Sequence, residues 1–209
     1  MFDFIKISRP RRMRVVCNGH PALRMKSLPV MAITDEIREL AQRMIVTMKE
    51  NEIPGVGLAA PQVGVNKRMI VIDTRPVGRK EKRAEKQKQL SPGEMMLNPL
   101  MPLALVNPEI LSSSAETETC GEGCLSLPGV EGEVTRPAKV LLRAKLLDGK
   151  EVMLECGGLL ARCLQHEIDH LDGVLFYDRI PKEQQEAAND VMAELAAQEA
   201  MLAATQQKI

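Results

Sequence analysis

The chain has 209 residues, and its 28 basic side chains balance 28 acidic ones, so the formal net charge at pH 7 is zero. This balance points to neither nucleic acid nor a strongly acidic partner, and no apolar run approaches the length of a membrane span. The five cysteines are odd in number and irregularly spaced, which favours a reducing compartment, so we expect a cytoplasmic protein built around one main core.

Residues 1–14, MFDFIKISRPRRMR, predict a basic extension. No apolar stretch follows these charges, as it would in a secretory signal. Met13 opens a more ordinary beginning, so Met1 and Met13 are both compatible with the start of translation. Residues 18–30 contain Asn18, Gly19, Pro21 and Pro29 and predict a loop.

A helix is predicted from Thr34, a favourable N-cap residue, to Asn51, because apolar residues recur at helical spacing. The stretch PGVGLAAPQ at residues 54–62 reads as a loop whose small residues let a backbone approach a ligand closely. It precedes a strand predicted at residues 69–73 instead of following one, which argues against a nucleotide-binding loop. Gln62 has two open roles: a donor to a substrate oxygen, or a tie within the loop.

Residues 75–104 interrupt this pattern. The run RPVGRKEKRAEKQKQ holds seven basic and two acidic residues and predicts a solvated loop, followed by a hydrophobic covering segment. Because the run contains no aromatic residues, solvated surface is the preferred interpretation over contact with RNA. A strand is predicted at residues 106–111, then a polar turn region at 112–119 and a tight, accessible turn in GEGCLSLPG at 121–129.

The stretch QHEIDHLDG at residues 165–173 carries two of the three histidines of the chain. On a helix His166 and His170 point the same way and can hold one metal ion, and Glu167 beside them suits proton transfer for a water on that metal. An apolar arc adjoins both histidines, so the chemistry is expected to point inward. The polar residues on the opposite side are Arg162, Gln165, Asp169 and Asp172.

Such a pair needs a third protein ligand, with one position left open for water. His20 lies in a predicted loop, and nothing downstream of His170 reads HxxGxxH. Cys124 is the best remaining soft donor, although by residue type alone it also suits apolar packing. A pair of Cys120 and Cys124 is the alternative, but with two histidines it would fill all four positions of a tetrahedral site. No position would remain for a water molecule, and Glu167 would have no role in catalysis.

Further elements flank this helix. Segments at residues 140–147 and 150–155 surround an Asp-Gly turn and predict an antiparallel hairpin. Residues 174–181, VLFYDRIP, predict a short strand that ends at a proline. That proline suits the first turn of a final, mildly acidic helix.

Three stretches, GVGLAAPQ at 55–62, EGCLSLPG at 122–129 and QHEIDHLDG at 165–173, together resemble the peptide deformylase family. The resemblance implies an α+β fold in which antiparallel sheets surround a central metal-binding helix, with a C-terminal helix. We therefore expect a catalytic domain at residues 15–180. The remaining expected parts are a basic extension at 1–14, an inserted loop at 75–104 and a C-terminal helix at 181–209.

The resemblance also implies the role of each site residue. Its metal ligands are Cys124, His166 and His170, and its general acid/base is Glu167. It places the Gln62 amide and the Leu125 backbone N–H at the oxyanion, and Gly57 beside the substrate backbone.

The reaction implied is hydrolysis of N-formylmethionyl nascent peptides to formate and a free amino terminus. Ligand softness alone suggests zinc, whereas the resemblance implies ferrous iron (Fe2+), with Zn2+, Ni2+ or Co2+ as substitutes. We expect transient ribosome association as a further contact, and neither DNA nor a membrane as a partner. A general zinc metalloprotease of the H-E-x-x-H type and a metal-stabilised, non-enzymatic module are the rival interpretations.

The chain departs from the family pattern in three places. Its insertion is long, and its last helix is acidic, unlike the basic helix that docks some relatives on the ribosome. Glu131 stands where many relatives have an arginine near the peptide groove. It either leaves a substrate contact unmade or pairs with a local cation such as Arg136.

Overall fold

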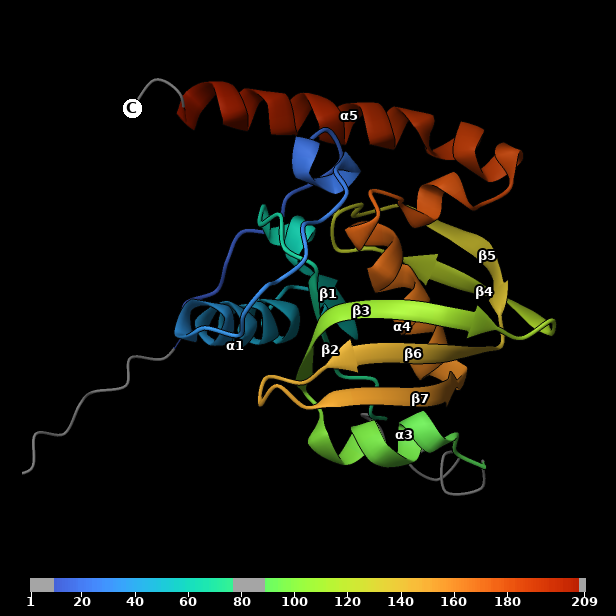
Figure 1. Cartoon of the computed structure of the whole chain (residues 1–209). Coiled ribbons are helices and arrows are strands. Elements are labelled where there is room, and N and C mark those ends of the chain that lie inside the picture. Colours follow the sequence, from blue (N-terminus) through green and yellow to red (C-terminus); the bar gives the residue numbers. More distant parts are fainter. Residues whose placement is uncertain (1–9, 77–88, 207–209) are drawn as a thin grey trace, which may run out of the picture.

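The computed structural model describes residues 10–76 and 89–206. A five-stranded antiparallel sheet has the order β1-β2-β3-β6-β7, and a second sheet pairs β4 with β5 (Figure 1). The strands of the large sheet are β1 (Gly57–Ala59), β2 (Met69–Ile72), β3 (Leu103–Ser113), β6 (Lys139–Lys145) and β7 (Glu151–Gly157). Those of the small sheet are β4 (Thr117–Gly123) and β5 (Glu131–Pro137).

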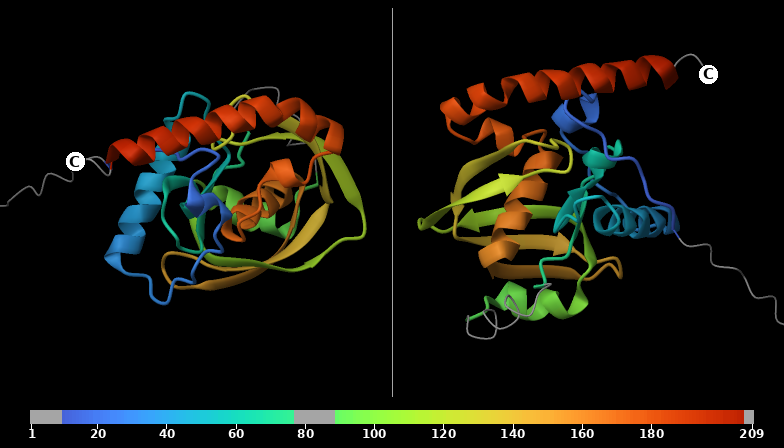
Figure 2. Two further views of the ribbon diagram at one scale, coloured as in Figure 1. Left: turned by 90° about the horizontal axis from the view of Figure 1, so that it is seen from above. Right: turned by 180° about the vertical axis from the view of Figure 1, so that it is seen from behind.

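Helix α4 (Gly158–Leu171) lies at the centre of the fold, and the strands curve around it (Figure 2). Its apolar residues, among them Leu164 and Ile168, pack into one core with β3, β6 and β7. The helix starts directly after β7, where Gly158 has a φ of 55° that favours glycine. The metal-binding stretch is thereby enclosed by the sheets, as expected for this α+β class.

Two further helices cover the other surfaces. Helix α1 (Asp35–Lys49) packs Ala41, Met44 and Met48 against the face of the large sheet that α4 does not occupy. This confirms the amphipathic helix predicted after Thr34, although the Thr34 side chain makes no capping hydrogen bond. Helix α3 (Pro92–Leu97) packs beside β7.

The final helix, α5 (Lys182–Gln206), lies across the amino-terminal segment (Figure 1). Met192 and Leu195 are buried in a core that also contains Phe176. The Asn18 side chain donates to the Met192 carbonyl at 2.9 Å. Gly19 approaches the helix so closely that a Cβ there would lie 2.7 Å from the Cα of Ala196. The predicted final helix is confirmed, and no described helix is both long and apolar enough to cross a bilayer.

The hairpin predicted around the Asp-Gly turn is confirmed as β6 and β7, and Gly149 has a φ of 88° in the turn. The strand predicted at residues 174–181 was wrong. A 3-10 helix, η4 (Phe176–Asp178), forms there, because the Asp178 carboxylate accepts from the Leu175 N–H at 2.8 Å and closes a tight turn.

Two other local predictions also need correction. The stretch read as a loop at residues 54–62 contains β1 and a 3-10 helix, η2 (Ala60–Val63). The polar turn region at residues 112–119 is shorter than predicted, because β3 continues through Ser113 and β4 begins at Thr117. Hydrogen bonds to neighbouring strands determine where these strands form and end. The hydrophobic pattern of the sequence does not reveal such bonds.

The insertion at 75–104 is described only in part. The expected covering segment forms α3 and a short 3-10 helix, η3 (Asn98–Leu100). Ser91 and Glu94 form a reciprocal capping box at the start of α3, a signal present in the sequence SPGE. Residues 77–88, which contain most of the basic run, lie outside the described residues.

Candidate active site

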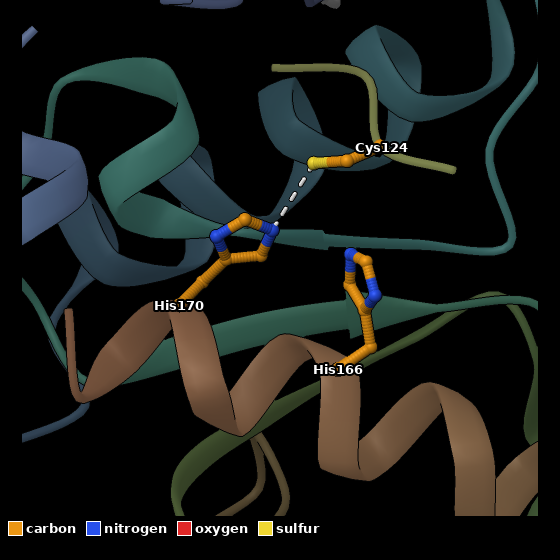
Figure 3. A group of neighbouring side chains, drawn as sticks. All are labelled: Cys124, His166 and His170. Atoms are coloured by element: carbon orange, nitrogen blue, oxygen red, sulfur yellow. Dashed lines mark hydrogen bonds between the residues drawn. The ribbon is translucent and has the colours of Figure 1, made fainter. Parts of the chain in front are cut away.

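His166 and His170 project from α4 toward Cys124, which directly follows β4 (Figure 3). One ligand atom of each of these three side chains lies within 4.8 Å of the others. Cys124 Sγ is 3.2 Å from His170 Nε2. The structure therefore brings together the two histidines and the cysteine selected from the sequence, although 42 residues or more separate the cysteine from either histidine.

These donors fit a divalent metal ion. One thiolate and two imidazoles are ligands that zinc and ferrous iron both accept, and three protein ligands leave a position open. The Nδ1 atom of His166 is engaged with Glu122 at 2.9 Å, which leaves Nε2 for the site. Glu167 Oε2 is buried and has no hydrogen-bond partner among the described residues, so a polar group is still missing there.

Glu167 is itself almost fully buried, with 4% of its surface exposed. Burial raises the pKa of this carboxyl group to about 7, and the neighbouring His166 opposes part of that shift. A carboxyl group with a pKa near neutrality both accepts and releases a proton readily, which suits a general acid/base.

Glu122 is a site residue that sequence analysis missed. Besides His166, its carboxylate accepts from Arg136 Nε at 2.6 Å and from Arg162 Nη1 at 2.7 Å. Although burial acts to raise it, the hydrogen bonds from His166 and Arg136 hold the pKa of Glu122 well below its usual range. Glu122 thereby fixes the ring of His166, a role that carboxylates often have behind metal-binding histidines. The available signal was a glutamate between glycines, two residues before the candidate cysteine.

The polar side of α4 is not a solvent-facing surface. Asp169 accepts from Arg136 Nη1 at 2.8 Å and from Arg179 Nε at 2.6 Å. Gln165 is also buried and donates to the Pro137 carbonyl at 3.0 Å. Because Arg136 joins Glu122 to Asp169, one buried ion-pair network ties β4, β5 and α4 together behind the candidate metal ligands.

Gln62 has the second of the two roles that residue type left open, since it ties down the loop. Its Oε1 atom accepts from the Ala59 N–H at 2.7 Å and ties the loop. Its Nε2 atom is 3.3 Å from Cys124 Sγ and 3.3 Å from Ser126 Oγ, so the amide donor is directed at the site. The third histidine of the chain, His20, instead accepts from the Ala22 N–H and caps the 3-10 helix η1 (Pro21–Arg24).

A cavity of about 860 Å³ opens beside these residues. It is lined by residues 55–57 at the start of β1, by 121–125 at the end of β4 and by 12–15 from the amino-terminal segment. Both β1 and β4 are edge strands of their sheets. Leu125 and Gly57, the other two predicted site residues, are therefore placed on the cavity, as is Glu167.

Gly57 leaves room for the Glu167 carboxylate. A Cβ at this position would lie 2.8 Å from Cys163 Sγ and closer still to Glu167 Oε1. We expect Gly57→Ala to displace the glutamate and lower kcat/KM by roughly 10²-fold, the scale of a 1 Å misplacement, while bound metal is retained. Formate release from a formyl-Met peptide, the reaction that the sequence resemblance implies, together with metal analysis measures both effects.

The matched control is Gly121→Ala. Gly121 lines the same cavity, but a Cβ there meets nothing within 4 Å. This variant should keep activity close to that of the unmodified protein. Equal losses in the two variants would show that any added methyl group in the cavity is harmful, and that the contact with Glu167 is not the cause.

Comparison with known proteins connects this geometry to one family. A family description, "Polypeptide deformylase", matches residues 12–186. "Peptide deformylase 2" of Gloeobacter violaceus is 47% identical over 162 residues, which cover 78% of this chain and 75% of that protein. A peptide deformylase of Rhizobium meliloti is 45% identical over 162 residues, covering 78% and 81% of the two chains.

Solved structures agree with the sequence comparison. A peptide deformylase from Plasmodium falciparum has a TM-score of 0.73 at 30% identity and covers 90% of this chain and 98% of its own. One from Synechococcus elongatus, in complex with actinonin, has a TM-score of 0.70 at 39% identity and covers 88% of both chains. The fold, the candidate metal-binding cluster and the matched length lead to one conclusion: the chain belongs to the peptide deformylase family, the metal-dependent hydrolases that remove the formyl group from the amino terminus of new polypeptides.

Proposed function

We propose that Cys124, His166 and His170 hold one ferrous ion in this deformylase and that Glu167 carries the proton of the reaction. The observation that supports this most directly is the arrangement of the three donors around one point, with an unpartnered, buried Glu167 oxygen on the same cavity. When bound, the ion supplies Lewis-acid chemistry, which acidifies a water molecule and stabilises negative charge on the formyl oxygen.

Glu167 takes the proton of the attacking water on its carboxylate and delivers it to the amine nitrogen of the leaving peptide. Formate and a free amino terminus are the products. The pKa of about 7 supports both halves of this task, because the carboxyl group gains and loses a proton at similar cost near neutral pH.

The oxyanion that forms at the formyl carbon needs donors that are already in place. Gln62 Nε2 and the Leu125 backbone N–H are the groups we assign to it. The Gln62 amide is held by its bond from Ala59, and its Nε2 contact with Ser126 Oγ at 3.3 Å is longer than the usual 2.9–3.0 Å for N–H···O bonds. A donor that is fixed in place yet weakly engaged is free to strengthen its hydrogen bond to a charge that develops beside Cys124.

The peptide itself is expected to bind in an extended form. Edge strands present unpaired backbone groups, and both β1 and β4 border the cavity with such an edge. Gly57 at the start of β1 then faces the substrate backbone. Recognition through the backbone suits an enzyme that must accept many different nascent sequences.

The same three ligands also suit zinc, so an experiment is needed to identify the metal. Protein purified without oxygen should contain about one iron ion per chain and release formate from a formyl-Met peptide. In air or peroxide, the iron form should lose activity at least roughly tenfold faster than a nickel-substituted form, because iron and the thiolate oxidise together.

Formate release and metal content, followed over the same time course, provide the measurement. Equal decay of the iron and nickel forms would count against iron as the labile centre. Casein cleavage without formate release would instead revive the general metalloprotease interpretation, and bound metal without turnover would revive the non-enzymatic module. Family membership supports neither alternative.

Several expectations stay predictions. These are the cytoplasmic location, transient ribosome association and the absence of DNA or a membrane as a partner. The expected division of the chain also stays a prediction: an extension at 1–14, a catalytic domain at 15–180 with an inserted loop at 75–104, and a C-terminal helix at 181–209. The first turn of α5 has acidic Glu183, and the helix surface carries more acidic than basic residues, so it is a poor match for the phosphates of ribosomal RNA. Any ribosome contact is therefore assigned to another surface.

A further inference from the structure

Glu131 lies at the mouth of the active-site cavity. It is the first residue of β5 and pairs in register with Gly123, the residue directly before the ligand Cys124. Its Cγ atom lies 3.9 Å from the place where a Cβ on Gly123 would be. The side chain is exposed and lines the cavity.

The Glu131 carboxylate has no ion-pair partner in the described parts of the chain. The suggested pair with Arg136 was wrong, because the Arg136 guanidinium is 3% exposed and is fully engaged by Glu122 and Asp169. The charge of Glu131 is therefore exposed at the cavity and is not paired by any described residue.

Two of the cations around the cavity have acidic partners elsewhere. Arg14 pairs with Glu199 of α5, and Arg162 pairs with Glu122. Arg12, an exposed residue that also lines the cavity, donates to the Glu50 carbonyl at 2.9 Å. Among the described cavity-lining residues within 121–131, Glu131 is the one exposed charge.

We propose that Glu131 selects formylated peptides by charge and favours a lysine or arginine over an aspartate or glutamate at one of the two positions after the formylmethionine. This inference rests on the proposed function. An extended peptide advances about 3.3 Å per residue. A chain whose formyl group lies at Cys124 and which follows the β4 edge places its second or third side chain near Glu131.

The test uses formyl-Met-X-Ala and formyl-Met-Ala-X peptides, in which X is Lys, Gln or Glu. For at least one position of X, kcat/KM for Lys should exceed that for Glu by about three- to tenfold at low ionic strength, and salt should reduce the ratio. Glu131→Gln should bring the ratio close to one, and Glu131→Arg should invert it. The melting temperature should stay unchanged for Glu131→Gln, because the side chain is exposed and unpaired.

Glu133→Gln is the matched control. Glu133 is exposed on the same strand, two residues further on, but it does not line the cavity. Its substitution should leave the Lys-to-Glu ratio unchanged. Equal kcat/KM for Lys and Glu peptides at both positions, or a preference that survives in Glu131→Gln, would overturn the inference. Absence of formate release from every peptide would instead overturn the proposed function.

Discussion

Glu167→Gln should keep about one metal ion per chain while kcat falls by roughly 10²- to 10⁴-fold. The substitution keeps the size of the side chain and leaves Cys124, His166 and His170 untouched. The amide cannot take up the proton of the attacking water or return it to the leaving amine. Metal analysis together with formate release on the same sample measures both properties.

A charge-matched control comes from Glu151→Gln on β7. Glu151 is exposed and lies outside the cavity, so this variant should match the unmodified protein in both measurements. Turnover close to normal in Glu167→Gln would remove Glu167 from the proton-transfer role. Loss of metal together with activity would mean that this carboxylate acts as a ligand instead.

Cys124→Ala should lose metal and activity together. Two imidazoles alone form a weak site, and metal affinity depends on the full set of deprotonated ligands. We expect metal content below about one tenth of the normal value after dialysis, with formate release reduced in proportion. Added metal at high concentration should restore little activity, because water would take the coordination position that the thiolate no longer fills.

Cys120→Ala tests the alternative in which Cys120 is a metal ligand. Cys120 is exposed on β4 and does not belong to the cluster formed by Cys124 and the two histidines. Its replacement should leave metal content and turnover close to normal. If Cys120→Ala lost the metal and Cys124→Ala kept it, the choice between the two cysteines would have to be reversed.

Local spacing made the candidate metal helix predictable. His166 and His170 are four residues apart, so the helix geometry alone puts both rings on one side. The final helix, α1 and the β6–β7 hairpin were predictable for the same reason, since capping, turn and periodicity signals lie within a few residues. For Cys124 the sequence supplied the best remaining soft donor, and the resemblance to a family implied the same ligand.

Long-range partners were not predictable in this way. Arg136 meets Glu122 across 14 residues and Asp169 across 33, and nothing in the local sequence distinguishes these charges from solvated ones. Strand β1 has only three residues, which is too short for alternation to reveal. Its pairing with β2 became visible only in the folded chain.

The contact between the two ends of the described chain affects the order in which the enzyme matures. Arg14 and the backbone N–H of Cys17 both donate to Glu199 on α5, and residues 12–15 and Cys17 contribute to the cavity wall. Translation reaches Glu199 after every residue that lines the cavity. The candidate metal ligands are complete once His170 has been synthesised. The amino-terminal wall is by then bonded to Thr47 and Gln62, but it gains its contacts with Glu199 only when α5 folds back onto it. A chain still being synthesised therefore acquires its reaction centre before its finished substrate groove.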